Sequence, residues 1–421
     1  MQPTFTLAVV YHVQATSCTP LRSSDALGNV DVVLRTPQGQ AYLQGSSLAG
    51  ALKAYALKNL GESRTAAILG STKGSGSLIV SDAYFSLDAR QEMRPRLRIN
   101  DHSASADDRG KFDVAHMAAG SRFSFELTWL GTEQTEAETK DVEQLLSALN
   151  SGLILLGGQK SNGFGRVELT VTRQRYNLMD DTDRTRWLER KFNGKTVCLS
   201  AIQPENIVTF ILHGQADRIL VKDSAPVHEK GGSVTVNLTE NGQPILPGSS
   251  IKGAVRGQVK RIAGYLGIGD ERVNALFGRK AQKNDQGVAG RVRFEDVSLS
   301  PYKQKISRIR INRFTGGVMN TGLFNEEPLC SKLTLKITAP ADDSVGCGLL
   351  VYALRDLGSG MYNLGSGDAI GQGYLKGDRL EIEVSSGERA AICFDEDGGC
   401  SLEDADGLIQ NWMQAVRREQ A

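Results

Sequence analysis

Apolar and polar residues alternate along two segments, one near the start of each half of the chain. Residues 4–13 read TFTLAVVYHV and residues 206–214 read NIVTFILHG. Such alternation predicts β-strands with one buried face. Downstream of each strand, a Gly-Ser-Ser turn leads into a segment with helical spacing, in which Leu48, Leu52 and Ala56 share one face. The same order of strand, turn and helix therefore occurs twice.

The similarity between the halves extends beyond these segments. QGSSLAGALK at residues 44–53 matches PGSSIKGAVR at residues 247–256, and LGGQKSNGFGRV at residues 156–167 matches LGSGDAIGQGYL at residues 364–375. Shorter blocks between these anchors keep the same order. We interpret the pattern as a tandem duplication.

Each copy predicts the element order βαββαβ, with a second helix that runs into a glycine-rich loop and a last strand. This order is that of a ferredoxin-like fold. The predicted fold class is α+β, with two tandem ferredoxin-like (RRM-like) domains that carry inserted loops. The expected divisions are a first domain at 1–174, a linker at 175–204 and a second domain at 205–421, which ends in a helix at about 402–419.

Composition narrows the class of protein. With 40% hydrophobic and 23% charged residues, the 421-residue chain is expected to be globular. Its net charge of +1 argues against binding nucleic acid by bulk charge, so basic patches must be local. Six cysteines without a CxxC pair indicate reduced thiols. The start of the chain lacks the pattern of a signal peptide or membrane span, so we expect a cytoplasmic protein without a membrane partner.

The glycine-rich loop lies between a helix and a strand, the reverse of the order in dinucleotide and P-loop sites. A nucleotide cofactor is therefore not expected. The spacing allows the bare backbone to approach phosphates or bases, with Lys160, Ser161 and Asn162 beside it. The alternative is a helix C-cap followed by a hairpin.

The Gly-Ser-Ser turn predicts an N-terminal helix end that offers N–H groups to an anion. Its serines are expected N-caps. In the second copy Lys252, Arg256 and Lys260 share one helical face, whereas the first copy has Ala49 in place of Lys252. A solvated surface is the other interpretation of this stripe. The four expected N-caps are Ser46, Ser47, Ser249 and Ser250.

Basic and apolar residues alternate in RPRLRIND, residues 94–101, and in KISRIRINRFTGG, residues 305–317. On strands, this pattern places the arginines of each segment on one face. Because a row of buried arginines is costly, we expect that face to meet water or a polyanion. Phe164 and Phe314 are candidates for stacking on bases, or alternatively for packing.

Together, PGSSIKGAVRG, LGGQKSNGFGRV and the ferredoxin-like pattern resemble the RAMP superfamily of CRISPR-associated proteins. More narrowly, the chain resembles the backbone subunits of type III effector complexes, and its two copies resemble a fused subunit of the type III-D variety. The resemblance implies that each copy binds a segment of CRISPR RNA, with target single-stranded RNA and other effector subunits as partners. The candidate RNA-binding residues are Arg22, Ser46, Ser47, Lys53, Arg96, Arg98, Lys160, Ser161, Asn162, Ser249, Ser250, Lys252, Arg256, Lys260, Arg308, Arg310 and Arg313.

The resemblance also implies cleavage of the paired target RNA by a loop aspartate with a divalent metal. Asp31, ahead of VVLR, is the matching residue and metal ligand, and Asp25 is the reserve candidate. The expected ion is Mg²⁺ or Mn²⁺. Taken without the resemblance, a loop aspartate is ordinarily a turn or capping residue.

The second copy departs from this pattern. Counting back from its turn places residues 231–233, Gly-Gly-Ser, where the aspartate is expected. Asp223 and Glu229 lie nearby and are retained as catalytic candidates. His228 is a possible general acid or base, or an exposed loop residue. The second copy is thus predicted to bind guide RNA with or without cutting.

Two alternatives remain open from the sequence. The chain is a non-catalytic scaffold of the same complex, or it is an endoribonuclease that processes the guide transcript. The latter calls for a general-base histidine. His12, in the first strand, is expected to lie in the core.

Overall fold

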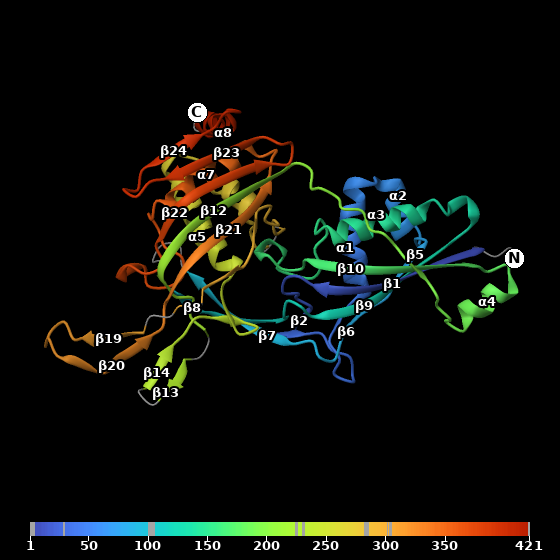
Figure 1. The fold of residues 1–421 in the computed structure, drawn as a ribbon, viewed down its shortest axis with the longest axis horizontal. Helices are drawn as coiled ribbons and strands as arrows, with labels where there is room; N and C mark the ends of the chain where they lie inside the picture. Colours follow the sequence, from blue (N-terminus) through green and yellow to red (C-terminus); the bar gives the residue numbers. More distant parts are fainter. Residues whose placement is uncertain are drawn as a thin grey trace. The chain divides into compact units, whose positions relative to one another are not determined.

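The computed structural model (Figure 1) shows a mixed α+β fold, which confirms the predicted class. The chain divides into two compact units, called unit 1 and unit 2. Unit 1 comprises Met1–Leu97, Asp108–Lys160 and Phe164–Gln203; unit 2 comprises Arg98–Asp107, Ser161–Gly163 and Pro204–Ala421. The described residues are 5–27, 30–99, 106–223, 226–229, 232–281, 286–300, 302 and 305–419.

Unit 1 contains a central antiparallel sheet in the order β11-β10-β1-β9-β6-β4, with β5 also paired to β9. Helices α1, α2 and α3 lie on one face of this sheet (Figure 1). The strands are β1 (Leu7–Ser17), β4 (Tyr42–Leu43), β5 (Leu78–Val80), β6 (Ala83–Phe85), β9 (Arg122–Gly131), β10 (Val167–Asn177) and β11 (Lys195–Thr196). The helices are α1 (Gly45–Asn59), α2 (Glu62–Leu69), α3 (Glu138–Asn150) and α4 (Asp181–Leu188), with short 3-10 turns η1 (Glu133–Thr135) and η2 (Lys160–Asn162).

Unit 2 repeats this arrangement with the order β17-β21-β12-β22-β23-β24. Helices α5 and α7 pack on its sheet, and α8 packs on α7. The strands are β12 (Ile207–Ile219), β17 (Arg293–Phe294), β21 (Leu329–Pro340), β22 (Leu375–Val384), β23 (Arg389–Phe394) and β24 (Cys400–Glu403). The helices are α5 (Gly248–Tyr265), α6 (Asp270–Phe277), α7 (Ser344–Gly358) and α8 (Leu408–Glu419), with a 3-10 turn η3 (Asp368–Ile370).

A second four-stranded sheet accompanies each central sheet, and its topology is the same in both units. The orders are β2-β3-β8-β7 and β13-β14-β20-β19. The strands are β2 (Ser24–Leu27), β3 (Val30–Val33), β7 (Gln91–Ile99), β8 (Ala106–Met117), β13 (Val227–Glu229), β14 (Gly232–Thr235), β19 (Ile306–Ile311) and β20 (Val318–Glu326). Unit 2 adds a small sheet of β15 (Thr239–Glu240), β16 (Gln243–Leu246) and β18 (Val297–Ser298). The duplication seen in the sequence is therefore a duplication of structure.

The periodicity of the sequence explains the two cores. In α5, the buried residues Ile251, Val255, Val259 and Ala263 recur every fourth position and face the core of unit 2. Leu48, Leu52 and Ala56 do the same in α1, as predicted. Each such stripe removes apolar surface from water, which is the main favourable contribution to folding.

Residues 175–203, which were expected to form a linker together with residue 204, lie within unit 1. Trp187 of α4 and Phe192 pack with Ala8, Val10 and Tyr176 on the face of the sheet opposite α1 and α3. β1 is therefore buried on both faces, which accounts for its nearly continuous apolar sequence.

Several boundaries differ from the expected ones. Helices α1 and α5 begin at the glycine of each turn, with Gln44 and Pro247 at the N-cap positions and no side-chain cap, so the expected serine N-caps are wrong. Residues 400–403 form a strand, and α8 begins at Leu408. The six cysteines carry free thiols. Among the described residues, no helix has the length and apolar character needed to cross a membrane.

Candidate nucleic-acid interface

The glycine of each Gly-Ser-Ser turn lies directly against the backbone of a neighbouring segment. A Cβ on Gly45 would lie 2.6 Å from the carbonyl oxygen of Val80, and a Cβ on Gly248 would lie 2.4 Å from that of Phe294. Both distances are below van der Waals contact, so no larger residue fits without displacement of the backbone. In both units, the glycine of the turn therefore allows the start of the helix to pack directly against the neighbouring segment.

An aspartate closes the start of the helix in each unit. The backbone N–H of Gly45 donates to Asp82 Oδ1 at 2.7 Å, and that of Gly248 donates to Asp296 Oδ1 at 2.7 Å. A carboxylate at this position satisfies an N–H group and interacts favourably with the helix dipole. The negative charge also makes this end of the helix a poorer phosphate site than the sequence analysis expected.

Sequence analysis did not identify these two aspartates. They lie 37 and 48 residues downstream of the glycines that they cap. The signal that was present is the shared aspartate in SLIVSDAYF, residues 77–85, and GRVRFEDVSL, residues 290–299. The two blocks align between the copies, and each holds its aspartate just before a short strand.

Lys53 and Arg256 occupy equivalent places and contact equivalent groups. Lys53 Nζ donates to the carbonyl of Gly70 at 2.7 Å, and Arg256 Nη1 donates to the carbonyl of Gly278 at 3.1 Å. Arg256 Nη2 also donates to Asn274 Oδ1 at 3.1 Å. These bonds hold α1 and α5 to the C-terminal ends of α2 and α6, where a positive charge is favourable.

The remaining polar residues of the turns and of the first glycine-rich loop have distinct surroundings. Lys252 Nζ donates to Ser161 Oγ at 2.8 Å inside unit 2, and Lys260 Nζ lies 3.9 Å from Asp270 Oδ2. Lys160, in η2, is exposed, and Asn162 is buried. The serines of the first turn, Ser46 and Ser47, are exposed, whereas Ser249 and Ser250 are half-buried.

Arg94 and Arg96 of β7 alternate with apolar residues as predicted, but their side chains face inward. Arg94 is only 4% exposed and its guanidinium lies 4.8 Å from the ring centroid of Phe164, a cation–π distance. Arg96 lies 6.0 Å from the same ring. The apolar residues between them, Met93 and Leu97, are 41% and 54% exposed. The expected orientation was wrong for Arg94, because the ring of Phe164 makes an inward guanidinium favourable.

Phe164 is fully buried, so base stacking by this ring is ruled out. His116 was not singled out by the sequence, yet its ring lies 5.4 Å from that of Phe164. Burial, reinforced by the positive charge of Arg94, lowers the pKa of His116 to about 3. Arg96 Nη1 also donates to Gln159 Oε1 at 3.0 Å, which ties β7 to the glycine-rich loop.

In unit 2 the equivalent loop position is Gln372, which is also fully buried. Gln372 Nε2 donates to Glu326 Oε2 at 3.5 Å. Arg308 and Lys222 each lie 3.6 Å from the same carboxylate. A polar cluster thus replaces the aromatic one beneath the second loop, and Arg308 is half-buried within it.

The hairpin of β19 and β20 carries exposed basic and apolar residues together. Arg310 and Arg313 are exposed, and Phe314, in the turn between the strands, is 99% exposed. Ile309 and Ile311 are also exposed. A cationic surface with an exposed aromatic ring is the combination that binds single-stranded nucleic acid.

The two glycine-rich loops have matching backbones. Gly157, Gly163 and Gly165 have positive φ, and so do the three corresponding glycines 365, 371 and 373. A Cβ on Gly157 would lie 2.2 Å from the carbonyl oxygen of Arg22, so this glycine also serves close packing. These glycines therefore supply the turn geometry and close packing of the two loops.

The catalytic candidates of unit 1 lie in a hairpin. Asp25 is in β2 and Asp31 is in β3, which runs parallel to β8 with Asp31 opposite Val114. The side chains of Asp25 and Asp31 lie outside the described part of the structure, as does that of Arg98. Asp31 is thus a strand residue by its backbone, where the sequence analysis expected a loop.

Backbone hydrogen bonds establish which residues of the two units correspond. The N–H of Leu34 donates to the carbonyl of Ser23, at 3.2 Å, and the N–H of Leu238 donates to that of Val221, at 2.7 Å. Ser23 and Val221 each follow directly after the residue whose carbonyl accepts a bond from the glycine-rich loop, Arg22 in unit 1 and Leu220 in unit 2. Leu34 and Leu238 are therefore equivalent.

Three residues earlier, this equivalence pairs Asp31 with Thr235. The parallel pairing agrees, because Thr235 lies opposite Glu326 in β20 as Asp31 lies opposite Val114 in β8. Counting back along the chain from the second turn had placed residues 231–233 at the position that corresponds to Asp31. The strand pairing shows instead that Thr235 is the equivalent residue. Unit 2 carries a hydroxyl where unit 1 carries a carboxylate.

The other candidates of unit 2 lie before this strand. Asp223 is half-buried, and its backbone N–H donates to the carbonyl of Val236 at 3.2 Å. His228 and Glu229 are in β13, opposite Ser233 and Gly232, and their side chains lie outside the described part of the structure.

His12 is not a core residue, contrary to expectation. Its side chain is 43% exposed, lies 3.6 Å from Glu126 and makes an edge contact with Phe192 at 3.8 Å between ring centroids. The alternation of β1 places it on the face covered by residues 175–203. On this face His12 lies beside the apolar cluster that contains Phe192.

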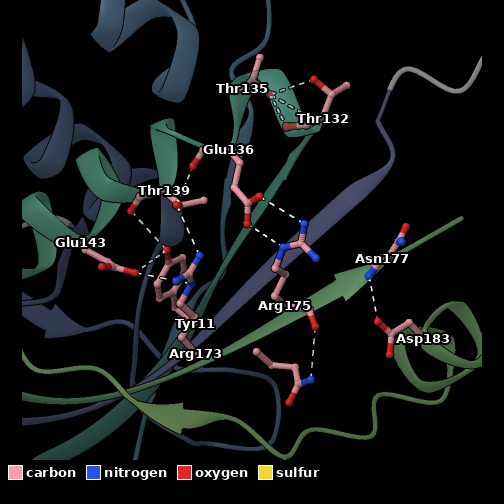
Figure 2. Close-up of polar contacts among 11 residues, drawn as sticks. Tyr11, Thr132, Thr135, Glu136, Thr139, Glu143, Arg173, Arg175, Asn177 and Asp183 are labelled. Atoms are coloured by element: carbon pink, nitrogen blue, oxygen red, sulfur yellow. Dashed lines mark hydrogen bonds and ion pairs between the residues drawn. The ribbon is translucent and has the colours of Figure 1, made fainter. Parts of the chain in front are cut away.

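A separate polar network joins α3 to the central sheet of unit 1 (Figure 2). Tyr11 donates to Glu143 Oε1 at 3.2 Å, and Arg173 Nε lies 3.5 Å from the same oxygen. Arg175 makes two bonds to the Glu136 carboxylate, at 2.6 and 3.2 Å, which lower the pKa of Glu136. Burial, aided by the charge of Glu143, raises the pKa of Tyr11. These residues fix the helix to the sheet.

Comparison with known proteins gives one family match in each half of the chain. The model of the RAMP superfamily matches residues 14–168 and 226–376, which is well over half of the sequence. A search of curated proteins found no match. Among solved structures, the chain is similar to one in the cryo-EM structure of the Type III-B Cmr-beta bound to cognate target RNA. That similarity has 18% identity and a TM-score of 0.32, and covers 38% of this chain and 58% of the other, less than two thirds of its length.

Proposed function

Since the chain belongs to the RAMP superfamily, we propose that it is a fused double backbone subunit of a type III CRISPR effector complex, active in the cytoplasm. In this role it binds CRISPR RNA along both units and meets target single-stranded RNA and the other subunits of the complex. One observation carries the proposal: each unit builds the same glycine turn, aspartate cap and glycine-rich loop at equivalent places.

The strand orders support two ferredoxin-like halves. In unit 1 the order β10-β1-β9-β6 places the last strand of the pattern beside the first, and the first beside the third. In unit 2 the order β22-β12-β21-β17 is equivalent. Helices follow the first and third strands of each pattern. This is the arrangement that βαββαβ connectivity gives in a ferredoxin-like fold.

The candidate RNA-binding residues differ in whether their side chains are exposed and able to reach RNA directly. Arg310, Arg313 and Phe314 are exposed on one hairpin and suit a phosphate backbone and a base. Lys53 and Arg256 already hold helix ends, so their contribution to binding is indirect. The exposed serines of the first turn and Lys160 are direct candidates in unit 1.

We further propose that unit 1 cleaves the paired target RNA through Asp31. A carboxylate is the type of ligand that Mg²⁺ or Mn²⁺ prefers, and the ion would supply positive charge to the reacting phosphate. In the reaction the ribose 2′-oxygen attacks the adjacent phosphorus and forms a 2′,3′-cyclic phosphate. The 2′-OH proton passes to solvent, the bond to the 5′-oxygen breaks, and the leaving 5′-oxygen takes up a proton from solvent. Unit 2 binds without cutting, because Thr235 stands at the equivalent position.

The test uses the assembled complex with labelled complementary RNA and Mg²⁺. Asp31→Ala is expected to abolish the cut nearest unit 1 while RNA binding is retained, and Asp25→Ala tests the reserve candidate. Cutting that survives Asp31→Ala removes the catalytic assignment. Binding with no cutting in any variant, wild type included, favours a scaffold. Metal-independent cleavage of the precursor transcript by the lone chain favours a processing enzyme.

A further inference from the structure

β12 contains a bulge beside the glycine-rich loop of unit 2. The register of β12 against β21 shifts between Ala216 and Ile219. Within the bulge, Arg218 has φ of 56°, in the left-handed region that residues other than glycine rarely adopt. Such a conformation is strained and persists only where the surroundings enforce it. Bulges commonly redirect a side chain next to a functional site.

Unit 1 makes the same contacts with its loop but has no extra residue. The N–H of Gly165 donates to the carbonyl of Pro20 at 3.0 Å, and the N–H of Gly158 donates to that of Arg22 at 3.2 Å. The two accepting carbonyls are two residues apart. The side chain of Arg22 also lies against Gly158, with Nη1 3.4 Å from the place of a Cβ.

In unit 2 the accepting carbonyls are three residues apart. The N–H of Gly373 donates to the carbonyl of Asp217 at 3.4 Å, and the N–H of Ser366 donates to that of Leu220 at 2.8 Å. Leu220 thus takes the place of Arg22, and its side chain is buried and uncharged. One residue has been added between the two contacts.

Because Leu220 stands in place of Arg22, unit 2 lacks a guanidinium at this position. The bulge supplies one from Arg218 instead. Arg218 Nη2 donates to the carbonyl of Gly371 at 3.1 Å, in the middle of the loop. A guanidinium has further N–H donors in a planar array suited to phosphate. Both units therefore place an arginine against the loop, from different backbone positions.

We propose that Arg218 binds an RNA phosphate at the loop of unit 2, and that Arg22 does the same at the loop of unit 1. The inference rests on the proposed function and names a contact that the sequence pattern did not indicate. The strained backbone of Arg218 is retained because it delivers the guanidinium to this loop.

Two carboxylates belong to the segments that meet at Arg218, and each accepts a hydrogen bond from a neighbouring side chain. Asp217 precedes Arg218, and Asp217 Oδ1 lies 3.5 Å from Gln215 Nε2, which donates to it. Asp368 of the loop accepts a bond of 2.6 Å from the Tyr374 hydroxyl. Both carboxylates thus have a donor of their own.

The test measures binding of the full-length chain to a labelled single-stranded RNA oligonucleotide over a range of salt concentrations. Arg218→Ala is expected to weaken binding about tenfold and to reduce the slope of log K against log salt by about 0.7, the share of one phosphate on a single strand. Arg22→Ala should give a loss of similar size, and the two losses should add.

A second variant separates binding from folding. Arg218→Gly removes the guanidinium and relieves the left-handed conformation, so it should weaken RNA binding while the thermal midpoint stays the same or rises. Arg190→Gly is the matched control, because Arg190 is exposed after α4 with φ of 53°. It should raise stability without loss of RNA affinity.

The outcomes distinguish two failures. If the wild type does not bind RNA, the proposed function fails and the inference fails with it. If the wild type binds, and Arg218→Ala and Arg218→Gly bind equally well with an unchanged salt slope, the inference about Arg218 is overturned and the proposed function stands.

Discussion

The backbone N–H of Gly248 donates to Asp296 Oδ1 at 2.7 Å, so a carboxylate already lies at the start of α5. The same bond joins Gly45 and Asp82 in unit 1. Its presence in both units shows that the Gly-Ser-Ser motif is first a means of joining a helix to the adjacent strand. Phosphate binding near this turn must therefore use the side chains around it.

Removal of either aspartate cap should destabilise its unit. Asp82→Ala and Asp296→Ala are each expected to lower the free energy of unfolding by about 1 kcal/mol, the usual value of a lost helix cap. Asp→Asn at the same positions keeps an oxygen acceptor and should cost less. Urea unfolding of the four variants measures the difference. An equal cost for Ala and Asn would show that the hydrogen bond is not the source of the effect.

The glycine of the turn should be sensitive to a single methyl group. Gly248→Ala places a Cβ 2.4 Å from the carbonyl oxygen of Phe294, and we expect a loss of about 1–3 kcal/mol. Gly253→Ala is the control on the same helix, because no atom lies within 4 Å of its added Cβ. This control should raise stability by about 0.5–1 kcal/mol. Thermal unfolding of both variants provides the comparison.

His116 should make unit 1 sensitive to acid. Its pKa is lowered from 6.5 to about 3 by burial and by Arg94, so the unfolded chain binds a proton that the folded chain does not. Stability should therefore fall as the pH falls from about 6.5 towards 3, with a slope of at most about 1.4 kcal/mol per pH unit. His116→Gln, which cannot take up that proton, should flatten this slope. Unfolding curves at several pH values test it, and an unchanged slope would contradict the assignment.

Thr235 offers a gain-of-function experiment. Because Thr235 and Asp31 share a register position, Thr235→Asp should add a second cut in the target RNA, at the segment bound by unit 2. Asp31→Ala combined with Thr235→Asp should move the cut from one segment to the other. Ser233→Asp, at a position that counting along the chain suggested, serves as the control and should add no cut. Product lengths on a denaturing gel report the outcome.

Sequence reasoning reached the duplication, the class of fold and the places of both motifs, because these depend on local periodicity and on short matching blocks. It failed where a distant contact decides the result. The alternation around Arg94 predicted a strand but not which face is inward, since that depends on Phe164, 70 residues away. The aspartate caps and the bulge at Arg218 also arise from pairing between distant segments.

Residues 175–203 show a further limit. The segment is rich in charge and reads as a connection, yet Trp187 and Phe192 cover the outer face of β1. A few large apolar residues in a polar segment are enough to bind it to a sheet. The sequence of β1, which is apolar on both faces, was the available indication.

The strands at the margins of the two central sheets are very short. β11, β4 and β17 have two residues each, and β24 has four. An edge strand of this length has few unpaired backbone N–H and C=O groups. Another chain therefore finds little to pair with as an added strand, and aggregation through the edges of the two central sheets is suppressed.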